Sequence, residues 1–354
     1  MSEVATPGWS GAPPRNVCIV MLSAIGDAVH VLPVANALKR AWPDTRITWV
    51  IQRVPHLLVE DHPAIDDFIV FRRRRGLHAW EGYAELARAV RERRFDLLIG
   101  LQVYFKAGLI TALVPADVKL GFDRARARDM NWLFTNRRIP PHEPQHVQDQ
   151  YFEFVRWLGI DPEPITWDLR LTDAEREAQA AFFERLGAPA CAVVVGTSKP
   201  KKNWAPEGYA RVLEHIERTH GLRPVLVGGP SPVERALADA VLERTGAAAV
   251  DALGDDLRRL VWIVEGSSLT LSPDTGPLHI SRALGTPVVG LFGYTNPKRS
   301  GPYGAYQDLV VDGYARHPGE EYPIEHTYRD GMGRITVEAV LDKVALAMER
   351  YVRD

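Results

Sequence analysis

Short apolar runs alternate along the chain with longer stretches that have the periodicity of amphipathic helices. Residues 17–22 (VCIVML) form a continuous apolar run, and apolar residues recur at near-helical spacing in residues 29–38. Further apolar runs follow at residues 47–51, 67–71 and 95–101. Continuous apolar strands that alternate with helices are typical of parallel sheets covered by helices on both faces. The first half of the chain is therefore predicted to form a doubly wound α/β domain.

The same pattern restarts in the second half of the chain. Its apolar runs and helical stretches are, in order, residues 192–195, 209–216, 224–227, 233–241, 269–271 and 288–292. A second doubly wound domain is predicted, so the expected fold is α/β, with two Rossmann-like domains that face each other across a cleft.

A polar stretch with two prolines, residues 161–168, separates the two cycles and is predicted to be the linker. A length of 354 residues agrees with two domains, at roughly 150 residues for each. We expect a disordered tail at residues 1–15, an N-terminal domain at 16–168 and a C-terminal domain at 169–335. A final helix is expected at residues 336–354, starting from a threonine that is a favourable N-cap.

Composition narrows the class of protein and its partners. The net formal charge of −2 gives no basic field, so no nucleic-acid partner is expected. Cys18 and Cys191 are predicted to be buried thiols in a reducing compartment. Residues 1–14 lack the features of a signal peptide, and no stretch approaches the ~18 apolar residues of a membrane-spanning helix. The sequence predicts a cytoplasmic protein without a transmembrane segment.

Three loops that follow predicted strands carry chemically useful side chains, and ligands of such sheets bind outside the carboxyl ends of the strands. The first loop is residues 23–27 (SAIGD), in which Gly26 permits close backbone approach and Asp27 stands at the start of a predicted helix. A carboxylate there could act as a general base. It could equally cap the helix. The loop by itself leaves both roles open.

The second loop, residues 272–279, contains Asp274, Thr275, Gly276 and His279. Free N–H groups at the start of the following helix, beside a hydroxyl and a glycine, form a cradle suited to a diphosphate. His279 lies one turn further on. It could reach the same phosphates or serve as a structural histidine.

The third loop, residues 196–204, contains Thr197, Ser198 and three lysines, among them Lys202. Hydroxyl and ammonium groups at the end of a strand can stabilise a developing phosphate charge. The alternative is a solvated lysine run. The basic run from Arg72 to Arg75 has the same two interpretations, a ligand site or a solvated face.

Several familiar motifs are missing from the sequence. There is no G-x-G-x-x-G turn, no Walker A sequence, no Asp-x-Asp pair and no H-E-x-x-H. Their absence argues against dehydrogenases and P-loop enzymes, and no dedicated metal site is expected.

The sequence around these loops resembles glycosyltransferase family 9, the ADP-heptose:lipopolysaccharide heptosyltransferases. The blocks that carry the resemblance are residues 22–43 (LSAIGDAVHVLPVANALKRAWP), 272–293 (SPDTGPLHISRALGTPVVGLFG) and 295–304 (TNPKRSGPYG). The resemblance extends over nearly the whole chain from Asn16 onward. It implies a GT-B fold whose last helix returns to the N-terminal domain. It also implies inverting sugar transfer that needs no metal and no other cofactor.

The resemblance implies roles for individual residues. Asp27 matches the family's catalytic base, and Lys202 is expected to act in the chemical step as well as in binding. The donor-binding positions are matched by Thr197, Ser198, Lys202, Asp274, Thr275, Gly276 and His279. The acceptor-binding positions are matched by Gly26, Arg72, Arg73, Arg75 and Arg128. The N-terminal domain is thus expected to bind the acceptor, and the C-terminal domain the nucleotide sugar.

The function that these matches imply is transfer of heptose from ADP-heptose, the co-substrate, to the inner core of lipopolysaccharide. The acceptor would be an anionic glycolipid of the lipid A–Kdo type, which would bring the enzyme to the inner face of the cytoplasmic membrane. One alternative is a family 9 transferase that uses another nucleotide sugar or another surface-glycan acceptor. The other is a non-catalytic nucleotide-sugar-binding protein. Asp27 together with Lys202 argues against the latter, since binding alone needs no base.

Overall fold

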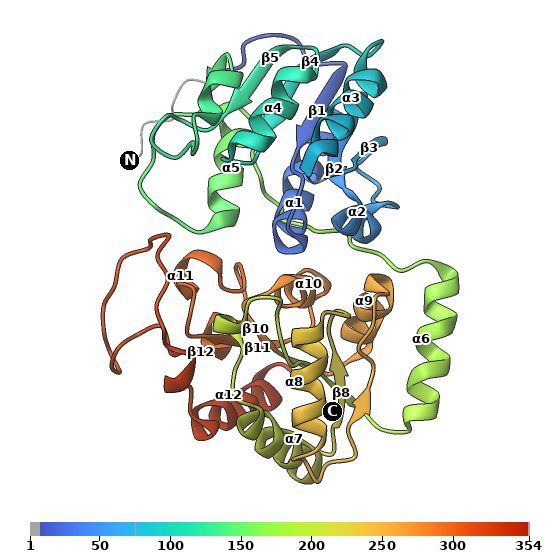
Figure 1. The fold of residues 1–354 in the computed structure, drawn as a ribbon, viewed down its shortest axis with the longest axis vertical. Coiled ribbons are helices and arrows are strands. Elements are labelled where there is room, and N and C mark those ends of the chain that lie inside the picture. The colour runs from blue at the N-terminus through green and yellow to red at the C-terminus, as the bar shows by residue number, and fades with distance from the viewer. Residues whose placement is uncertain (1–7, 75, 353–354) are drawn as a thin grey trace. The chain divides into compact units, whose positions relative to one another are not determined.

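The computed structural model of the protein describes residues 8–74 and 76–352. The chain divides into two compact units (Figure 1). Unit 1 contains the chain up to Glu143 together with Val147–Arg170, and unit 2 contains Pro144–His146 together with the chain from Leu171 onward.

The segment predicted to be the linker, residues 161–168, is bound along unit 1. His62 Nε2 lies 2.8 Å from the carbonyl oxygen of Trp167. The side-chain amide of Asn36 donates to the carbonyl oxygen of Thr166, also at 2.8 Å. These bonds satisfy the polar backbone of the segment, which is why the second unit starts only beyond it.

Part of the expected N-terminal tail lies outside the described residues, namely residues 1–7. The described part begins at Gly8, whose N–H donates to the carbonyl oxygen of Trp157 at 2.8 Å. The chain is therefore attached to unit 1 from Gly8 onward.

Unit 1 is built on a six-stranded parallel sheet with the strand order β3-β2-β1-β4-β5-β6. The strands are β1 (Asn16–Val20), β2 (Arg46–Gln52), β3 (Asp67–Phe71), β4 (Phe95–Gly100), β5 (Ala116–Gly121) and β6 (Arg137–Arg138). The helices are α1 (Ile25–Ala41), α2 (Arg53–Val59), α3 (Ala79–Val90), α4 (Phe105–Leu113) and α5 (Val147–Trp157), with short 3₁₀ turns at Gly76–His78 and Asn131–Phe134.

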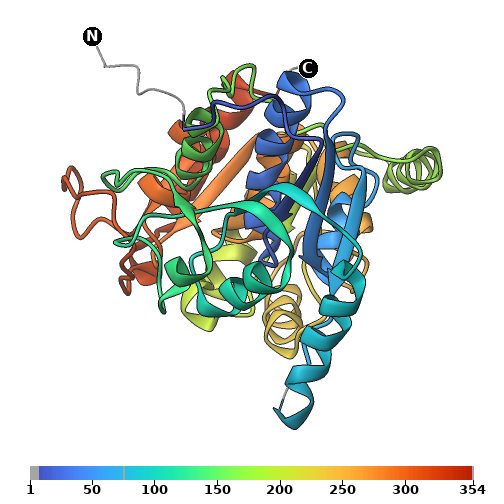
Figure 2. The ribbon, with the colours of Figure 1, turned by 90° about the horizontal axis from the view of Figure 1, so that it is seen from above.

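Helices cover both faces of this sheet, as the continuous apolar strands predicted. Cys18 and Val20 of β1 pack in one cluster with Leu86 of α3 and Ile110 of α4. Helix α1 contacts α2 and α5 and forms the other layer. Figure 2 shows α1 and α3 on opposite sides of the strands. Both cysteines, Cys18 and Cys191, are buried free thiols, as expected.

Unit 2 repeats the design, with the strand order β12-β11-β10-β7-β8-β9 and all strands parallel. The strands are β7 (Ala190–Val194), β8 (Arg223–Val227), β9 (Val250–Asp251), β10 (Leu269–Pro273), β11 (Val288–Phe292) and β12 (Val310–Asp312). The helices are α6 (Asp173–Leu186), α7 (Pro206–His220), α8 (Pro232–Leu242), α9 (Leu257–Gly266), α10 (Gly276–Leu284), α11 (Pro297–Ser300) and α12 (Val337–Arg350), with 3₁₀ turns at Pro200–Lys202, Gln307–Leu309 and Met332–Arg334.

The last helix was expected to pack back on the N-terminal domain, and its apolar face lies in the core of unit 2. Helix α12 contacts α7 and β11, and Val340, Val344 and Ala347 on its apolar face are fully buried in the core of unit 2. Periodicity identified the apolar face correctly, but it carries no information about which surface covers that face.

Strand order reverses once in each sheet, and that point locates a ligand site in open α/β sheets. In unit 1 the order turns between β1 and β4, so the loops after these two strands flank the switch point. In unit 2 it turns between β7 and β10. The loops containing Asp27, Lys202 and Asp274 follow β1, β7 and β10, and all three therefore lie at switch points.

Candidate active site

The first predicted loop ends in helix α1, and Asp27 is the third residue of that helix. Its Oδ2 accepts the N–H of Ala24 at 2.9 Å, so the carboxylate does cap the helix start. Its other oxygen, Oδ1, lies 3.5 Å from the hydroxyl of Tyr151 in α5. Asp27 is half-buried, and the adjacent Gly26 is buried. The two roles that the sequence left open are compatible, because capping uses one carboxylate oxygen only.

Gln102, from the loop after β4, holds the loop in front of Asp27. Its Oε1 accepts the N–H of Leu22 at 3.1 Å, and its Nε2 donates to the carbonyl oxygen of Ser23. A single side chain thus binds the backbone of two consecutive residues just before α1. Gln102 was not among the site residues predicted from the sequence. The signal that could have found it is its position after β4, on the other side of the switch point.

A buried polar pair lies one helical turn behind Asp27. His30 Nδ1 lies 2.9 Å from Oε1 of Gln148, and the amide nitrogen of Gln148 donates to the carbonyl oxygen of His30 at 3.0 Å. Gln148 is fully buried, and the ring of His30 meets that of Tyr151 edge-on at 6.4 Å. These two hydrogen bonds join α1 to α5, and so fix the helix that contains Asp27 against the helix that contains Tyr151.

The second and third loops meet in unit 2 through an ion pair. Lys202 Nζ lies 2.7 Å from Oδ2 of Asp274 and 2.7 Å from its carbonyl oxygen. The hydroxyl of Thr295, just after β11, donates to the same Oδ2 at 2.5 Å. His279 Nε2 lies 3.8 Å from Oδ1. Three of these residues were predicted donor residues, and Thr295 was not, although it opens the motif at residues 295–304.

Asp274 is held in its charged form. Burial alone would raise the pKa of this carboxyl, but the charge of Lys202, followed by the hydrogen bond and charge of His279, lowers it more strongly. The net result is a pKa well below the ordinary value. The pair therefore stays ionised at physiological pH and joins the two loops into one rigid unit.

The start of helix α10 faces this pair. Thr275 is the N-cap residue, and its side chain makes no capping hydrogen bond. Gly276 and Pro277 are the first residues of the nine-residue helix. The first N–H groups of a helix have no partner within it and carry partial positive charge, so this end can bind an anion. With the ammonium of Lys202 nearby, the arrangement suits a diphosphate.

Thr197 makes hydrogen bonds within the third loop and so fixes its shape. The hydroxyl of Thr197 donates to the carbonyl oxygen of Lys199 at 2.9 Å and accepts the N–H of the same residue at 3.0 Å. The N–H of Thr197 donates to Oδ1 of Asn203 at 2.8 Å. Thr197 is buried and Ser198 is exposed. Of the two predicted hydroxyl ligands, Ser198 is the one that faces solvent, while Thr197 shapes the loop that carries Lys202.

The predicted acceptor residues stand on either side of the Asp27 loop. Arg72 and Arg73 follow β3 and are exposed, and Arg75 lies outside the described residues. Arg128 follows β5, is exposed, and has its guanidinium 5.9 Å from the ring centre of Tyr104. Because β3 and β5 lie on opposite sides of β1 in a parallel sheet, Arg72, Arg73 and Arg128 all follow its carboxyl-terminal end.

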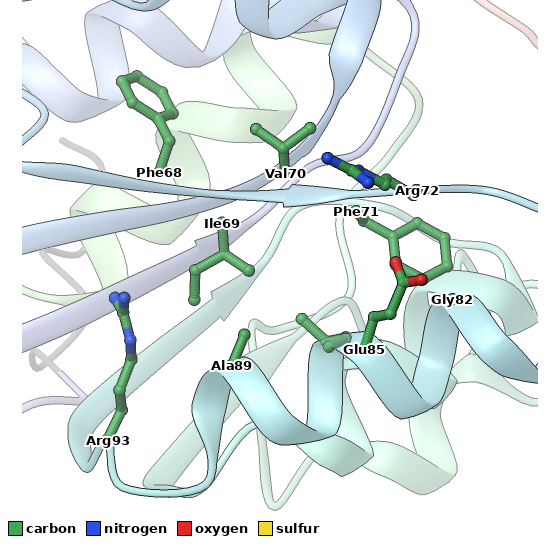
Figure 3. A pocket seen from close by; sticks show the side chains of 10 residues that line it. Phe68, Ile69, Val70, Phe71, Arg72, Gly82, Glu85, Ala89 and Arg93 are labelled. Carbon is green, nitrogen blue, oxygen red and sulfur yellow. The ribbon is translucent and has the colours of Figure 1, made fainter.

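A pocket of about 280 Å³ lies between β3 and α3 in unit 1. Figure 3 shows Ile69, Phe71 and Glu85 on the pocket side of the strand and Arg93 at one end. Arg93 forms an ion pair with Asp67. The pocket borders Arg72 but belongs to the edge of the sheet, away from the switch point.

No group of three or more His, Cys, Asp or Glu side chains is placed to hold a metal ion among residues 8–74 and 76–352. Within the same residues, no helix is both long enough and apolar enough to span a bilayer.

Two Rossmann-like doubly wound units, each with polar loops at its switch point, have the architecture of the GT-B fold. The model of glycosyltransferase family 9 (heptosyltransferase) matches residues 83–323. The chain belongs to this family and is a glycosyltransferase, which confirms the predicted resemblance and fold.

Curated relatives match along most of their length. The chain is 30% identical over 310 residues to the lipopolysaccharide core heptosyltransferase OpsX of Haemophilus influenzae, with 87% of each chain covered. It is 29% identical over 300 residues to lipopolysaccharide heptosyltransferase 1 of Salmonella typhimurium, covering 82% of this chain and 92% of the relative.

Solved structures show the same fold. A family 9 glycosyl transferase from Veillonella parvula superposes with a TM-score of 0.79 at 22% identity, covering 95% of this chain and 97% of the other. The E. coli heptosyltransferase WaaC with ADP superposes with a TM-score of 0.71 at 22% identity, covering 94% and 98%.

Proposed function

We propose that this enzyme transfers heptose from ADP-heptose to the inner core of lipopolysaccharide, with inversion at the anomeric carbon and without a metal ion. The relatives named above are lipopolysaccharide heptosyltransferases, and solved relatives are described with ADP and with ADP-2-deoxy-2-fluoro heptose. The observation that carries the proposal is the ion pair between Lys202 and Asp274, which joins two loops. It places an ammonium group beside the N-terminus of α10.

Asp27 acts as the base in this reaction. Its carboxylate takes the proton of the acceptor hydroxyl while the acceptor oxygen forms a bond to the anomeric carbon of the heptose. The bond from that carbon to the phosphate oxygen breaks on the opposite side, and its electron pair leaves with ADP. Attack and departure on opposite sides invert the configuration.

The departing diphosphate needs positive charge more than it needs a proton. Lys202 and the N–H groups at the start of α10 supply that charge in a fixed arrangement, which is the form of stabilisation that contributes most in enzymes. In other transferases a metal ion supplies the same stabilisation. Ser198 is exposed beside Lys202 and adds a hydroxyl donor.

The acceptor is proposed to be an anionic glycolipid of the lipid A–Kdo type, bound through Arg72, Arg73 and Arg128. These cations are exposed beyond the carboxyl-terminal end of the sheet, where the loop with Asp27 also lies. Guanidinium groups pair well with the carboxylates and phosphates of such lipids.

A transfer assay tests the proposal directly. Purified enzyme is incubated with ADP-heptose and a truncated Kdo-lipid A acceptor, and the product is analysed by mass spectrometry and by NMR of the new anomeric centre. We expect one added heptose, an inverted linkage and an unchanged rate in EDTA. ADP-glucose, UDP-glucose and UDP-N-acetylglucosamine serve as competing donors. Faster transfer from any of them would overturn the donor assignment, and loss of activity in EDTA, restored by Mg²⁺, would overturn the metal-independent mechanism.

A further inference from the structure

A long loop, residues 313–331, begins and ends at the same point of unit 2. It leaves strand β12 at Gly313 and returns at Gly331, where a Cβ atom added to Gly331 would lie 2.1 Å from the carbonyl oxygen of Gly313. The two backbones touch, and only glycine fits there. A loop of this length without helix or strand of its own is uncommon in a compact domain, and such loops are often functional.

Internal contacts hold the loop in one shape. The guanidinium of Arg329 donates to the carbonyl oxygen of Tyr314 and to Oε2 of Glu320, each at 3.0 Å. It also lies over the Tyr314 ring, 4.2 Å from the ring centre. The hydroxyls of Tyr314 and Thr327 are 2.5 Å apart. These ties cross the loop from its first residues to its last, so the loop forms a rigid support.

The loop is bound to the segment that follows β11, which contains Thr295. Tyr328 pairs with Thr295 in an antiparallel bridge, and the N–H of Arg329 donates to the carbonyl oxygen of Tyr294 at 3.0 Å. Directly opposite residues of such a pair have Cβ atoms roughly 5 Å apart. The hydroxyl of Thr295 bonds to Asp274. Tyr328 therefore lies one residue away from the predicted diphosphate site.

The ring of Tyr328 is presented to solvent and held from behind. It stacks on the ring of Tyr294, with 4.7 Å between centroids and 15° between planes. Even so, half of Tyr328 is exposed, at 50%. An aromatic ring offers a large apolar face with little conformational freedom to lose on binding. The C–H face of a sugar ring is a suitable partner for it.

The loops after β7 and β10 have β8 and β9 on one side and β11 and β12 on the other. A nucleotide sugar whose diphosphate lay between these two loops would extend toward β8 and β9 at one end and toward β11 and β12 at the other. On the β8 side, Gly228 lies beside the carboxylate of Glu234 and the side chain of Leu253, and the N–H of Gly229 donates to Oε1 of Glu234 at 2.9 Å. On the β11 side stands Tyr328, beside the hydroxyl of Thr327.

We propose that Tyr328, supported by Tyr294, stacks on the sugar ring of the nucleotide-sugar donor and so selects the sugar rather than the nucleotide. The proposal rests on the proposed function, because it takes the diphosphate to lie at Asp274 and the start of α10. It adds a sugar subsite built by the loop 313–331.

Calorimetric titration of the full-length enzyme with ADP and with ADP-2-deoxy-2-fluoro-heptose tests the subsite. The ratio of the two dissociation constants measures what the sugar adds to binding. For Tyr328→Ala we expect the affinity for the sugar nucleotide to fall roughly three- to tenfold, the range expected for loss of one aromatic stack, with the affinity for ADP unchanged. Tyr328→Phe keeps the ring and should keep the ratio.

Tyr351→Ala is the matched control, because Tyr351 is another exposed tyrosine of unit 2, paired with Tyr306. It should change neither affinity. If Tyr328→Ala fails to fold, Tyr328→Leu keeps the bulk of the side chain without the aromatic face and should show the same loss.

The remaining outcomes separate the two proposals. If Tyr328→Ala lowers the affinities for ADP and for the sugar nucleotide equally, the ring stacks on the base. If it changes neither affinity, the ring does not contact the donor. Either result overturns the subsite alone. A wild-type enzyme that binds neither compound would overturn the proposed donor as well.

Discussion

The ammonium nitrogen of Lys202 lies 2.7 Å from both the carboxylate Oδ2 and the carbonyl oxygen of Asp274, a residue in a different loop. Their side chains are only 16% and 9% exposed. The pair crosses the switch point of unit 2 and gives one side chain two tasks. Lys202 holds the loop that precedes α10, and it places positive charge where the diphosphate is proposed to bind.

Lys202→Met is expected to reduce stability as well as activity. The substitution leaves the buried carboxylate of Asp274 without its main partner, and loss of one member of a buried pair costs roughly 3–5 kcal/mol. Because Thr295 and His279 remain beside the carboxylate, we expect about 3 kcal/mol, measured by urea unfolding at pH 7. The neighbouring Lys201 is exposed, and Lys201→Met should change stability by less than about 0.5 kcal/mol. Equal stabilities of the two variants would refute the structural role of the pair.

Asp274 should make stability depend on acid pH. Its pKa is lower in the folded protein than the ordinary value of 3.8, so its contribution is fully present above that value. The contribution is lost as the pH falls from there toward the folded pKa. The difference in unfolding free energy between wild type and Asp274→Asn, measured by urea unfolding from pH 7 downward, should stay constant to about pH 5 and shrink below about pH 4. A difference that grows on acidification would contradict the assignment.

Asp27→Asn separates the two tasks of Asp27. The amide oxygen of asparagine can still accept the N–H of Ala24, so the start of α1 should remain intact. Asparagine cannot take a proton from the acceptor, and loss of a general base typically lowers the rate ~10²–10⁴-fold. We expect that loss in kcat, with the affinity for ADP retained, because the donor loops belong to unit 2. A variant that turns over at nearly the normal rate would remove Asp27 from the mechanism.

The sequence predicted the elements of both units well because hydrophobic periodicity is a local property. Residues 17–22 and 67–71 were predicted strands and correspond to β1 and β3. The loops after the strands could be recognised for a similar reason, since a glycine or a carboxylate just beyond a strand is visible in the chain itself.

Contacts between distant elements could not be predicted in the same way. The bonds from Gln102 to Leu22 and Ser23 exist because β4 pairs with β1, a fact that depends on strand order. The bond between Thr295 and Asp274 likewise depends on β11 lying next to β10. The core that covers the apolar face of α12 could not be predicted for the same reason, because the periodicity of a helix does not identify the surface that covers it.

Gln102→Ala should impair the chemical step without affecting donor binding. Both of its bonds hold the loop that precedes Asp27, and a displacement of about 1 Å at a reacting group can cost ~10²-fold in rate. We expect kcat to fall about 10- to 100-fold while the dissociation constant for ADP stays unchanged. Gln102→Glu keeps the acceptor for the N–H of Leu22 and loses the donor to Ser23, so it should fall between wild type and Gln102→Ala. An alanine variant with normal kcat would show that the loop holds its shape without this side chain.

Replacement of both Arg72 and Arg73 by alanine tests the acceptor edge. The two side chains are exposed beyond β3, and no ion pair ties them down among the residues that the structure describes. Arg74 is the matched control in the same run, because it is already engaged by Glu85 at 2.9 Å and Glu81 at 3.3 Å. We expect the double variant to raise the acceptor KM about tenfold at low salt and less at high salt, since exposed charges are screened beyond a Debye length. Arg74→Ala should leave KM nearly unchanged, because its charge is balanced by the two glutamates. A similar rise in KM for Arg74→Ala would mean that the run acts only through its total charge, and an unchanged KM in the double variant would make it a solvated face.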